Sequence, residues 1–306
     1  MLDAASPAIM SRFLDIHAAE EGLSASQVEG VRFLRISRPL SRHAVLYPPS
    51  ILFVVQGSMR SYLGEEYHIC DQNHFLILSI PLPLECEIPD ATREKPFLAL
   101  CIELNYMMLG GLLLEMDDIL PETEAPRGIG TGELVLDMRG ALVRLLNSLG
   151  DTMESRILGP SIVRELVYRT LRSEQGRILQ AIGGMDGNSR RVLKALGVIQ
   201  RDYAKELDVE TMAKEAGMSI SNFYLAFRAV TASSPVQYLK SIRLHKAKQL
   251  ITKEGMNVSS AAACVGYTNS SQFSREYRRF FGNSPIEEAK ARHFRADKIK
   301  LGKDKV

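Results

Sequence analysis

The 306-residue sequence has few cysteines and no long apolar segment. Its four cysteines lie far apart, with no CxxC pair, which argues against a disulfide framework or a zinc site and favours a reducing cytoplasm; they are Cys70, Cys86, Cys101 and Cys264. No apolar run approaches the roughly 20 residues that span a bilayer. The first twenty residues carry acids among their apolar residues and lack the basic start of a secretory signal. We therefore expect a cytoplasmic globular protein that does not enter a membrane.

Catalytic motifs are also missing. We find no nucleophile elbow, no glycine-rich phosphate loop and no paired metal motif, so no catalytic residue and no cofactor is predicted. His68 and His74 are the candidates for a metal site, but they flank a predicted turn, form no HxH pair and have no later histidine nearby. The sequence thus predicts no metal site. A redox or electrophile sensor remains conceivable, although Glu85 and Glu87 would raise the pKa of the Cys86 thiol.

The formal net charge of +2 hides an uneven distribution. Residues 188–306 hold 22 Lys and Arg against 11 Asp and Glu, whereas residues 1–187 hold 16 against 25. A swing of this size is hard to attribute to chance variation. It indicates a basic module that meets a polyanion and an acidic module with another task.

Residues 30–104 have the pattern of short strands. Seven segments rich in β-branched and aromatic residues are separated by turns, among them hairpin turns predicted at 64–66 and 71–73; the segments are VRFLRI, ILFVVQG, SMRSYL, YHIC, HFLILSI, LECEI and PFLALCIEL. Strands this short and closely spaced indicate a small antiparallel barrel or sandwich.

After residue 105 the apolar period becomes helical. Leu134, Met138, Ala141, Leu145 and Leu149 fall on one helix face, and Pro160 opens a second helix. These leucine-rich helices, within 132–182, either cap the barrel or form the seam of a homodimer. GGMDGNS at 183–189 is the clearest linker. We predict an α+β protein with an N-terminal domain at 1–183, a linker at 184–189 and an all-helical domain at 190–306.

The helical domain contains the same short pattern twice: GMSISNFYLAFRAVTASSP at 217–235 and GYTNSSQFSREYRRFFGNSP at 266–285. In each, a small-residue helix meets a glycine turn and then a second helix with an aromatic stripe, which predicts helix-turn-helix units at about 207–231 and 257–281. The stripes are Phe223, Phe227 and Val230 in one unit and Phe273, Tyr277 and Phe280 in the other. Their helical spacing favours core packing over base stacking.

The opposite faces of the two second helices are polar. Solvated surface is the plain interpretation, but a repeated polar face in a basic domain favours DNA contact. Residues placed for base edges are Ser221, Tyr224, Leu225, Ser270, Ser271, Ser274 and Arg275; those placed for phosphates are Arg228, Arg278 and Arg279. Arg275 is the best candidate for bidentate pairing with guanine. Lys240, Arg243, Lys246 and Lys248 on the connecting helix are either plain solvated surface or further DNA contacts.

The helix between the units supports the same interpretation. From Pro235 to about Ile251 it would be roughly 25 Å long at 1.5 Å per residue. With its flanking turns it can hold two recognition helices about one DNA turn apart, roughly 34 Å.

On these residues the C-terminal hundred positions resemble the AraC/XylS family of bacterial transcription regulators. The second repeat and SSPVQYLKSIRLHKAKQLI at 233–251 match its signature, while Ala232 replaces a usual glycine and Glu288-Ala289 a usual Tyr-Arg. The segments LYPPSILFVVQGSMRSYLGEEYHICDQNHFLILSIPLPLECEI and PFLALCIELN resemble the cupin-like N-terminal domain of one branch.

That resemblance implies a regulator, more often an activator, that binds double-stranded operator DNA as a homodimer. It also implies a small-molecule effector in the N-terminal domain, which would shift the population of DNA-competent arrangements. A contact with RNA polymerase is possible but not visible in the sequence. The alternatives are a barrel that only dimerises, and a cupin-type metal-dependent enzyme with an appended DNA-binding domain.

Overall fold

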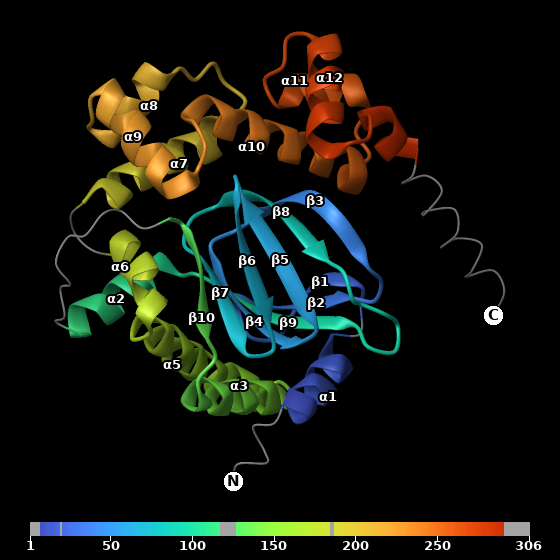
Figure 1. Cartoon of the computed structure of the whole chain (residues 1–306), viewed down its shortest axis with the longest axis vertical. Helices are drawn as coiled ribbons and strands as arrows, with labels where there is room; N and C mark the ends of the chain where they lie inside the picture. The colour runs from blue at the N-terminus through green and yellow to red at the C-terminus, as the bar shows by residue number, and fades with distance from the viewer. Residues whose placement is uncertain (1–6, 19, 117–126, 184–186, 291–306) are drawn as a thin grey trace.

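The computed structural model describes residues 7–18, 20–116, 127–183 and 187–290. Ten strands form two antiparallel sheets, and the helices lie below them and above them (Figure 1). The six-stranded sheet has the order β1-β2-β9-β4-β7-β10 and the four-stranded sheet the order β3-β8-β5-β6. A β-rich N-terminal part followed by a helical part is the predicted α+β architecture.

All seven predicted strand segments are strands. The ten strands are β1 Gly22–Ala25, β2 Val31–Ile36, β3 Leu40–Tyr47, β4 Ser50–Gln56, β5 Ser58–Leu63, β6 Glu66–Asp71, β7 His74–Leu78, β8 Leu82–Ile88, β9 Phe97–Glu103 and β10 Ile129–Glu133. The turn at 64–65 closes the β5–β6 hairpin as predicted. The turn at Gln72–Asn73 closes no hairpin, because β6 and β7 belong to different sheets; it carries the chain from one sheet to the other.

The interior of the barrel lies between the two sheets. Leu52 and Val54 of β4 lie on the same face of the large sheet as Leu76 and Leu78 of β7, and this face packs against the inward side chains of the small sheet, including Leu84. The alternate residues of the large sheet, such as Ile51 and Phe53 on β4, point the other way. Two layers of alternating side chains therefore give this part of the chain two separate hydrophobic clusters.

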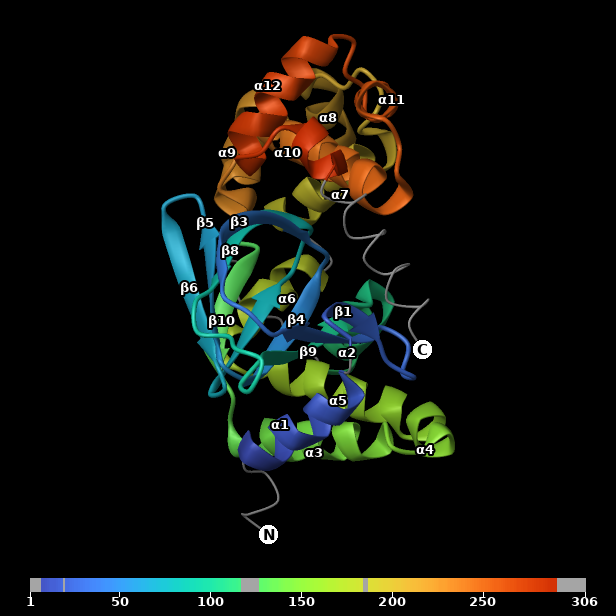
Figure 2. The same ribbon diagram turned by 90° about the vertical axis from the view of Figure 1, so that its right-hand side faces the viewer.

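Helices cover the outer face of the large sheet (Figure 2). They are α1 Pro7–His17, α2 Tyr106–Met116, α3 Leu136–Ser148, α4 Thr152–Ile157, α5 Gly159–Leu171, the 3-10 turn η2 Glu174–Gly176 and α6 Arg177–Gly183. The predicted stripe from Leu134 to Leu149 is buried, and Pro160 stands in the first turn of α5. Most of the leucines of 132–182 thus cap the sheet.

The remaining helices form the upper layer. They are α7 Asn188–Asp202, α8 Val209–Ala216, α9 Ile220–Thr231, α10 Pro235–Gln249, the π-turn η3 Leu250–Glu254, α11 Val258–Cys264 and α12 Ser270–Phe281. Helix α7 begins within the linker predicted at 184–189, and the predicted domain limits stay a prediction. Residues 285–290 are helical, and the rest of the helix predicted from Pro285 lies outside the described residues.

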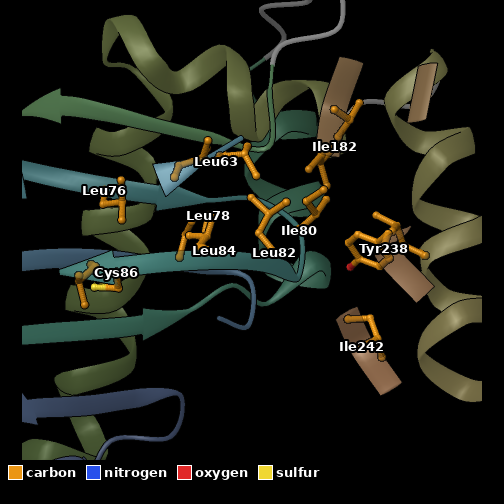
Figure 3. Packing of buried hydrophobic residues seen from close by; sticks show 14 of the residues in the cluster. Leu63, Leu76, Leu78, Ile80, Leu82, Leu84, Cys86, Ile182, Tyr238 and Ile242 are labelled. Carbon is orange, nitrogen blue, oxygen red and sulfur yellow. The ribbon is translucent and has the colours of Figure 1, made fainter. Parts of the chain in front are cut away.

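The upper layer rests directly on the barrel. Ile80 and Leu82 at the end of the small sheet pack with Tyr238 and Ile242 of α10 in one cluster (Figure 3). The Tyr238 hydroxyl donates a hydrogen bond to the carbonyl oxygen of Pro81 at 2.5 Å. The amide of Gly128 donates to the carbonyl oxygen of Val230 at the end of α9, at 2.8 Å. The barrel and the first helix-turn-helix unit therefore share one hydrophobic core.

Candidate DNA-binding surface

The first helix-turn-helix unit consists of α8 and α9. The Asp208 side chain accepts a hydrogen bond from the Thr211 amide at 2.7 Å and begins α8. Gly217 ends that helix in the left-handed conformation, with φ of 65°. Ser219 then caps α9 by accepting from the Asn222 amide. Two capped helices thus meet across a three-residue turn, as the repeat predicts.

The aromatic stripe of α9 is core. Phe223, Phe227 and Val230 are all buried, which confirms the predicted stripe. The Phe223 and Phe227 ring centroids are 5.3 Å apart, and Phe227 meets the ring of Tyr238 edge-on at 5.4 Å. Because this face is fixed against α10 and the barrel, the opposite face of α9 is left to solvent.

The second unit, α11 and α12, has the same construction. The Asn269 side chain accepts hydrogen bonds from the amides of Ser271 and Gln272, both at 2.9 Å, and so begins α12. Phe273 and Tyr277 are buried as predicted, while Phe280 lies at the edge of the core against the ring of His245. The two units stand at opposite ends of α10 (Figure 1).

The polar residues predicted to meet DNA lie on the outward faces of α9 and α12. Leu225 is 70% exposed and Tyr224 38%, which leaves two large side chains in solvent beside polar neighbours. Ser274 is half-buried, and the others are exposed: Ser221, Arg228, Ser270, Ser271, Arg275, Arg278 and Arg279. Within the described residues Arg275 has no ion-pair partner, so its guanidinium is available to a ligand. Contact with DNA at these positions remains a prediction.

The four basic residues of α10 make contacts with other groups of the protein. Arg243 donates from Nε to the carbonyl oxygen of Tyr203 at 2.7 Å and from Nη2 to that of Lys205 at 2.8 Å. Lys246 lies over the Tyr203 ring. Partial burial lowers the pKa of Arg243. Arg243 therefore holds the end of α7 to α10, a role that neither interpretation of the sequence included.

The other two bind the second unit. Lys240 Nζ lies 3.2 Å from Glu276 Oε1 on α12, and Lys248 Nζ lies 3.0 Å from Glu288 Oε1. Lys248 also stands over the ring of Phe281 at 4.4 Å. These lysines fasten the second unit to the connecting helix.

Glu276 is the residue of this surface that the sequence did not reveal. Besides Lys240, it accepts hydrogen bonds from the Tyr267 hydroxyl at 2.8 Å and from Gln272 Nε2 at 3.1 Å. Partial burial opposes ionisation, but the hydrogen bonds from Gln272 and Tyr267 and the charge of Lys240 hold the pKa of Glu276 below its usual value. Gln272 at i−4 is the sole local signal for this network.

The barrel histidines do not converge. His74 Nδ1 lies 2.7 Å from Asp71 Oδ1, whereas His68 faces the barrel interior beside its cross-strand partner Ser61. Across the part of the chain that the structure describes, no three His, Cys, Asp or Glu side chains gather as a metal site would require. Three thiols, Cys70, Cys86 and Cys101, are buried, and burial raises the pKa of Cys86 and of Cys101 to about 11.

The barrel interior holds polar atoms without partners. Ser61 Oγ, His68 Nε2 and Thr131 Oγ1 are buried and make no hydrogen bond. Ser61 stands between Cys86 on β8 and His68 on β6 in the same inward row. Burial lowers the pKa of His68, so its ring is neutral at neutral pH. Such groups are costly to bury unless a further molecule satisfies them.

The fold and this surface define a helix-turn-helix DNA-binding protein with a β-barrel domain. A family model for the AraC-type transcriptional regulator N-terminus matches residues 27–178, and a helix-turn-helix domain model matches residues 212–291. The chain belongs to the family of AraC-type transcriptional regulators, and it is a DNA-binding regulator of transcription.

Curated relatives point the same way. The lactose operon transcription activator of Staphylococcus xylosus is 22% identical over 246 residues, which cover 79% of this chain and 84% of that protein. The HTH-type transcriptional activator RhaS of Salmonella schwarzengrund is 26% identical over 184 residues, 59% of this chain and 63% of that protein. These relatives are regulators of transcription and none of them is named as an enzyme.

Among solved structures, the apo form of a ToxT variant from Vibrio cholerae superposes with a TM-score of 0.58 over 88% of this chain and 98% of that chain, at 11% identity. ToxT bound to an unsaturated fatty acid gives 0.55 over 84% and 94%, at 10% identity. At these identities the likeness establishes the fold. No helix among residues 7–18, 20–116, 127–183 and 187–290 is long and apolar enough to cross a membrane.

Proposed function

We propose that the protein binds operator DNA by placing α9 and α12 in successive major grooves. The observation that carries this proposal is the pair of exposed polar faces at the two ends of α10, each backed by a buried aromatic stripe. Base edges are recognised by Ser221, Tyr224, Leu225, Ser270, Ser271, Ser274 and Arg275, and phosphates by Arg228, Arg278 and Arg279. Arg275 pairs with guanine.

Selection from random duplex DNA followed by hydroxyl-radical footprinting tests this proposal. We expect an enriched sequence with two conserved blocks about one helical turn apart, both protected on the same face of the duplex. A single block, or enrichment without any sequence preference, would refute binding by two recognition helices.

We further propose that the barrel binds a small neutral effector. Support comes from the unpartnered polar atoms of Ser61, His68 and Thr131 in an interior lined mainly by apolar side chains. Neutral hydroxyl and imidazole groups suit a ligand with hydroxyl or carbonyl oxygens better than an ion. Thermal shift across a metabolite panel tests this, because a ligand at 100 times its Kd stabilises by about 2.7 kcal/mol. A Ser61→Ala variant that keeps the full shift would argue against this location.

Activation, dimerisation and location in the cell complete the proposal. The named relatives are activators, so we infer that this protein also raises transcription in the cytoplasm, through contact with RNA polymerase. A homodimer would offer four recognition helices to a repeated operator. Light scattering of the purified chain with and without operator DNA tests the dimer, and a reporter fused to the selected promoter tests activation.

A further inference from the structure

The two helix-turn-helix units belong to different hydrophobic cores. The first unit shares its core with the barrel, whereas the second has a core of its own that includes Phe273 and Tyr277. Helix α10 contributes to both, with Leu239 and Ile242 in the first and Ala247 in the second. Helix α10 therefore joins the two cores, while α12 also contacts β3 and the turn at Gly266 lies against the backbone of Ala204.

One ion pair crosses from the first half of α10 to the second unit. Lys240 stands between Leu239 and Ile242, in the half of α10 that packs on the first core, yet its ammonium reaches Glu276 on α12. Apolar contacts are non-directional, but a carboxylate that receives a charged donor and two further hydrogen bonds accepts a narrow range of positions. The pair thus restrains α12 against the unit that is fixed to the barrel.

Glu276 also restrains its own helix. The Tyr267 hydroxyl, from the turn before α12, and Gln272, one turn earlier in α12, both donate to it. The Tyr267 ring meets that of Phe273 edge-on at 5.2 Å, so the turn is itself anchored in the core. The neighbouring side chain, Arg275, points outward. A rotation of α12 about its axis would break the bonds from Tyr267 and Lys240 and displace Arg275, whereas Gln272 would turn together with Glu276.

We propose that Glu276 is a positioning residue that fixes the separation of the two DNA segments recognised by α9 and α12, an inference that rests on the proposed function above. One extra base pair between the segments moves the second by about 3.4 Å along the duplex and turns it by about 35°. When Glu276 holds α12 in place, the protein cannot adjust to that change and binds the altered duplex more weakly. Without Glu276, α12 can move relative to α9, and the protein binds duplexes with several separations.

Binding to duplexes with altered separation tests the inference. The selected operator is made at its native separation and with one base pair added or removed, and the Kd is measured for the wild type and Glu276→Gln. Glutamine keeps the volume and removes the charge. We expect the wild type to lose at least about tenfold on changing the separation, about 1.4 kcal/mol, and Glu276→Gln to lose less than about threefold.

Glu288→Gln is the matched control. Glu288 also pairs with a lysine of α10, Lys248, but it follows α12 in the chain and lies outside the recognition helix. It should keep the wild-type preference for one separation. Lys240→Met, which leaves the Tyr267 and Gln272 bonds, should relax the preference as Glu276→Gln does, and it carries the test if Glu276→Gln does not fold.

The two possible failures are distinguishable. If Glu276→Gln and Lys240→Met, folded by circular dichroism, keep the full tenfold preference, the positioning role is overturned while binding through two units stands. If Glu288→Gln relaxes the preference equally, the effect is a general loosening of the second unit, which also overturns it. If the wild type itself shows no preference among the three separations, the inference is overturned, and the number of conserved blocks in the selected sequence decides whether the proposed function stands.

Discussion

The hydroxyl of Tyr238, on the helix that joins the two DNA-binding units, donates to the carbonyl oxygen of Pro81 in the barrel at 2.5 Å. Tyr238 is fully buried, and burial raises its pKa, so the group remains a neutral donor. Two parts of the chain separated by more than 150 residues are joined here by a hydrogen bond inside a common hydrophobic cluster. A displacement of Pro81 in the barrel would therefore move Tyr238, whose ring contacts Phe227 of the first recognition helix.

Replacing Tyr238 by Phe removes this hydrogen bond and keeps the ring. We expect the free energy of unfolding to fall by about 1 kcal/mol, because the carbonyl of the half-buried Pro81 loses its donor. Urea unfolding followed by circular dichroism measures it. Tyr277→Phe is the matched control, since Tyr277 is equally buried and its hydroxyl has no partner. A loss as large for Tyr277→Phe would remove the special role of the Pro81 contact.

Ala232 ends α9 in the left-handed conformation, with φ of 53°. Among the residues that the structure describes it is the one non-glycine with a positive φ. Since Cβ disfavours this region, Ala232→Gly should raise the free energy of unfolding by about 0.5–1 kcal/mol. Ala229→Gly, in the exposed interior of the same helix, should lower it by about 1 kcal/mol. Equal losses for both variants would contradict the strain at Ala232.

The second unit should weaken in acid. His245 packs edge-on against the rings of Phe280 and Phe281, and burial, with the charge of Lys248, lowers its pKa to about 3. Its unfolded pKa is about 6.5, so the unfolded chain binds the proton more readily between these values. Stability from the neutral ring is complete above about pH 6.5 and falls as the pH drops toward 3.

A His245→Leu variant should therefore lose part of the stability change between pH 7 and pH 4, measured as the urea midpoint at each pH. His43→Leu, at an exposed position on β3, is the control variant for this comparison. The account is contradicted if His245→Leu has the same pH profile as the wild type.

Thiol chemistry separates the cysteines. Cys264 is exposed at the end of α11, and the other three are buried. Burial raises the pKa of Cys70, Cys86 and Cys101, so these thiols form little thiolate at neutral pH. Ellman's reagent should modify one thiol quickly in the native protein and three slowly. Cys264→Ser should remove the fast phase, and a fast phase that persists would mean that a buried thiol is reachable.

Much of the fold follows from the sequence because the signals are local. The helix-turn-helix units are predicted by glycine turns and aromatic stripes within twenty residues, and the structure has these features in the expected places. Strands with alternating or fully apolar runs, such as β8, were predicted for the same reason.

Other elements carry no local signal. Strand β10 is the segment IGTGE, whose glycines interrupt any apolar pattern; at Gly132 a Cβ would lie 2.3 Å from the Phe75 ring, so the neighbouring strand dictates the residue. Strand β3 is mostly half-exposed and shows no clear alternation. The bonds of Glu276 to Lys240 and of Tyr238 to Pro81 join residues far apart in sequence, and only the folded chain brings them together.

The most direct test compares Arg275→Ala with Arg278→Ala on the selected operator and on all single-base variants of it. Arg275→Ala should abolish discrimination at one or two base pairs in the block bound by α12, a loss of about 1–3 kcal/mol there, and leave the other block unchanged. Arg278→Ala should weaken all sequences alike and reduce the salt dependence of log K by about one unit. If both variants merely weaken binding uniformly, α12 does not recognise bases, and the account of DNA recognition by two helices is wrong.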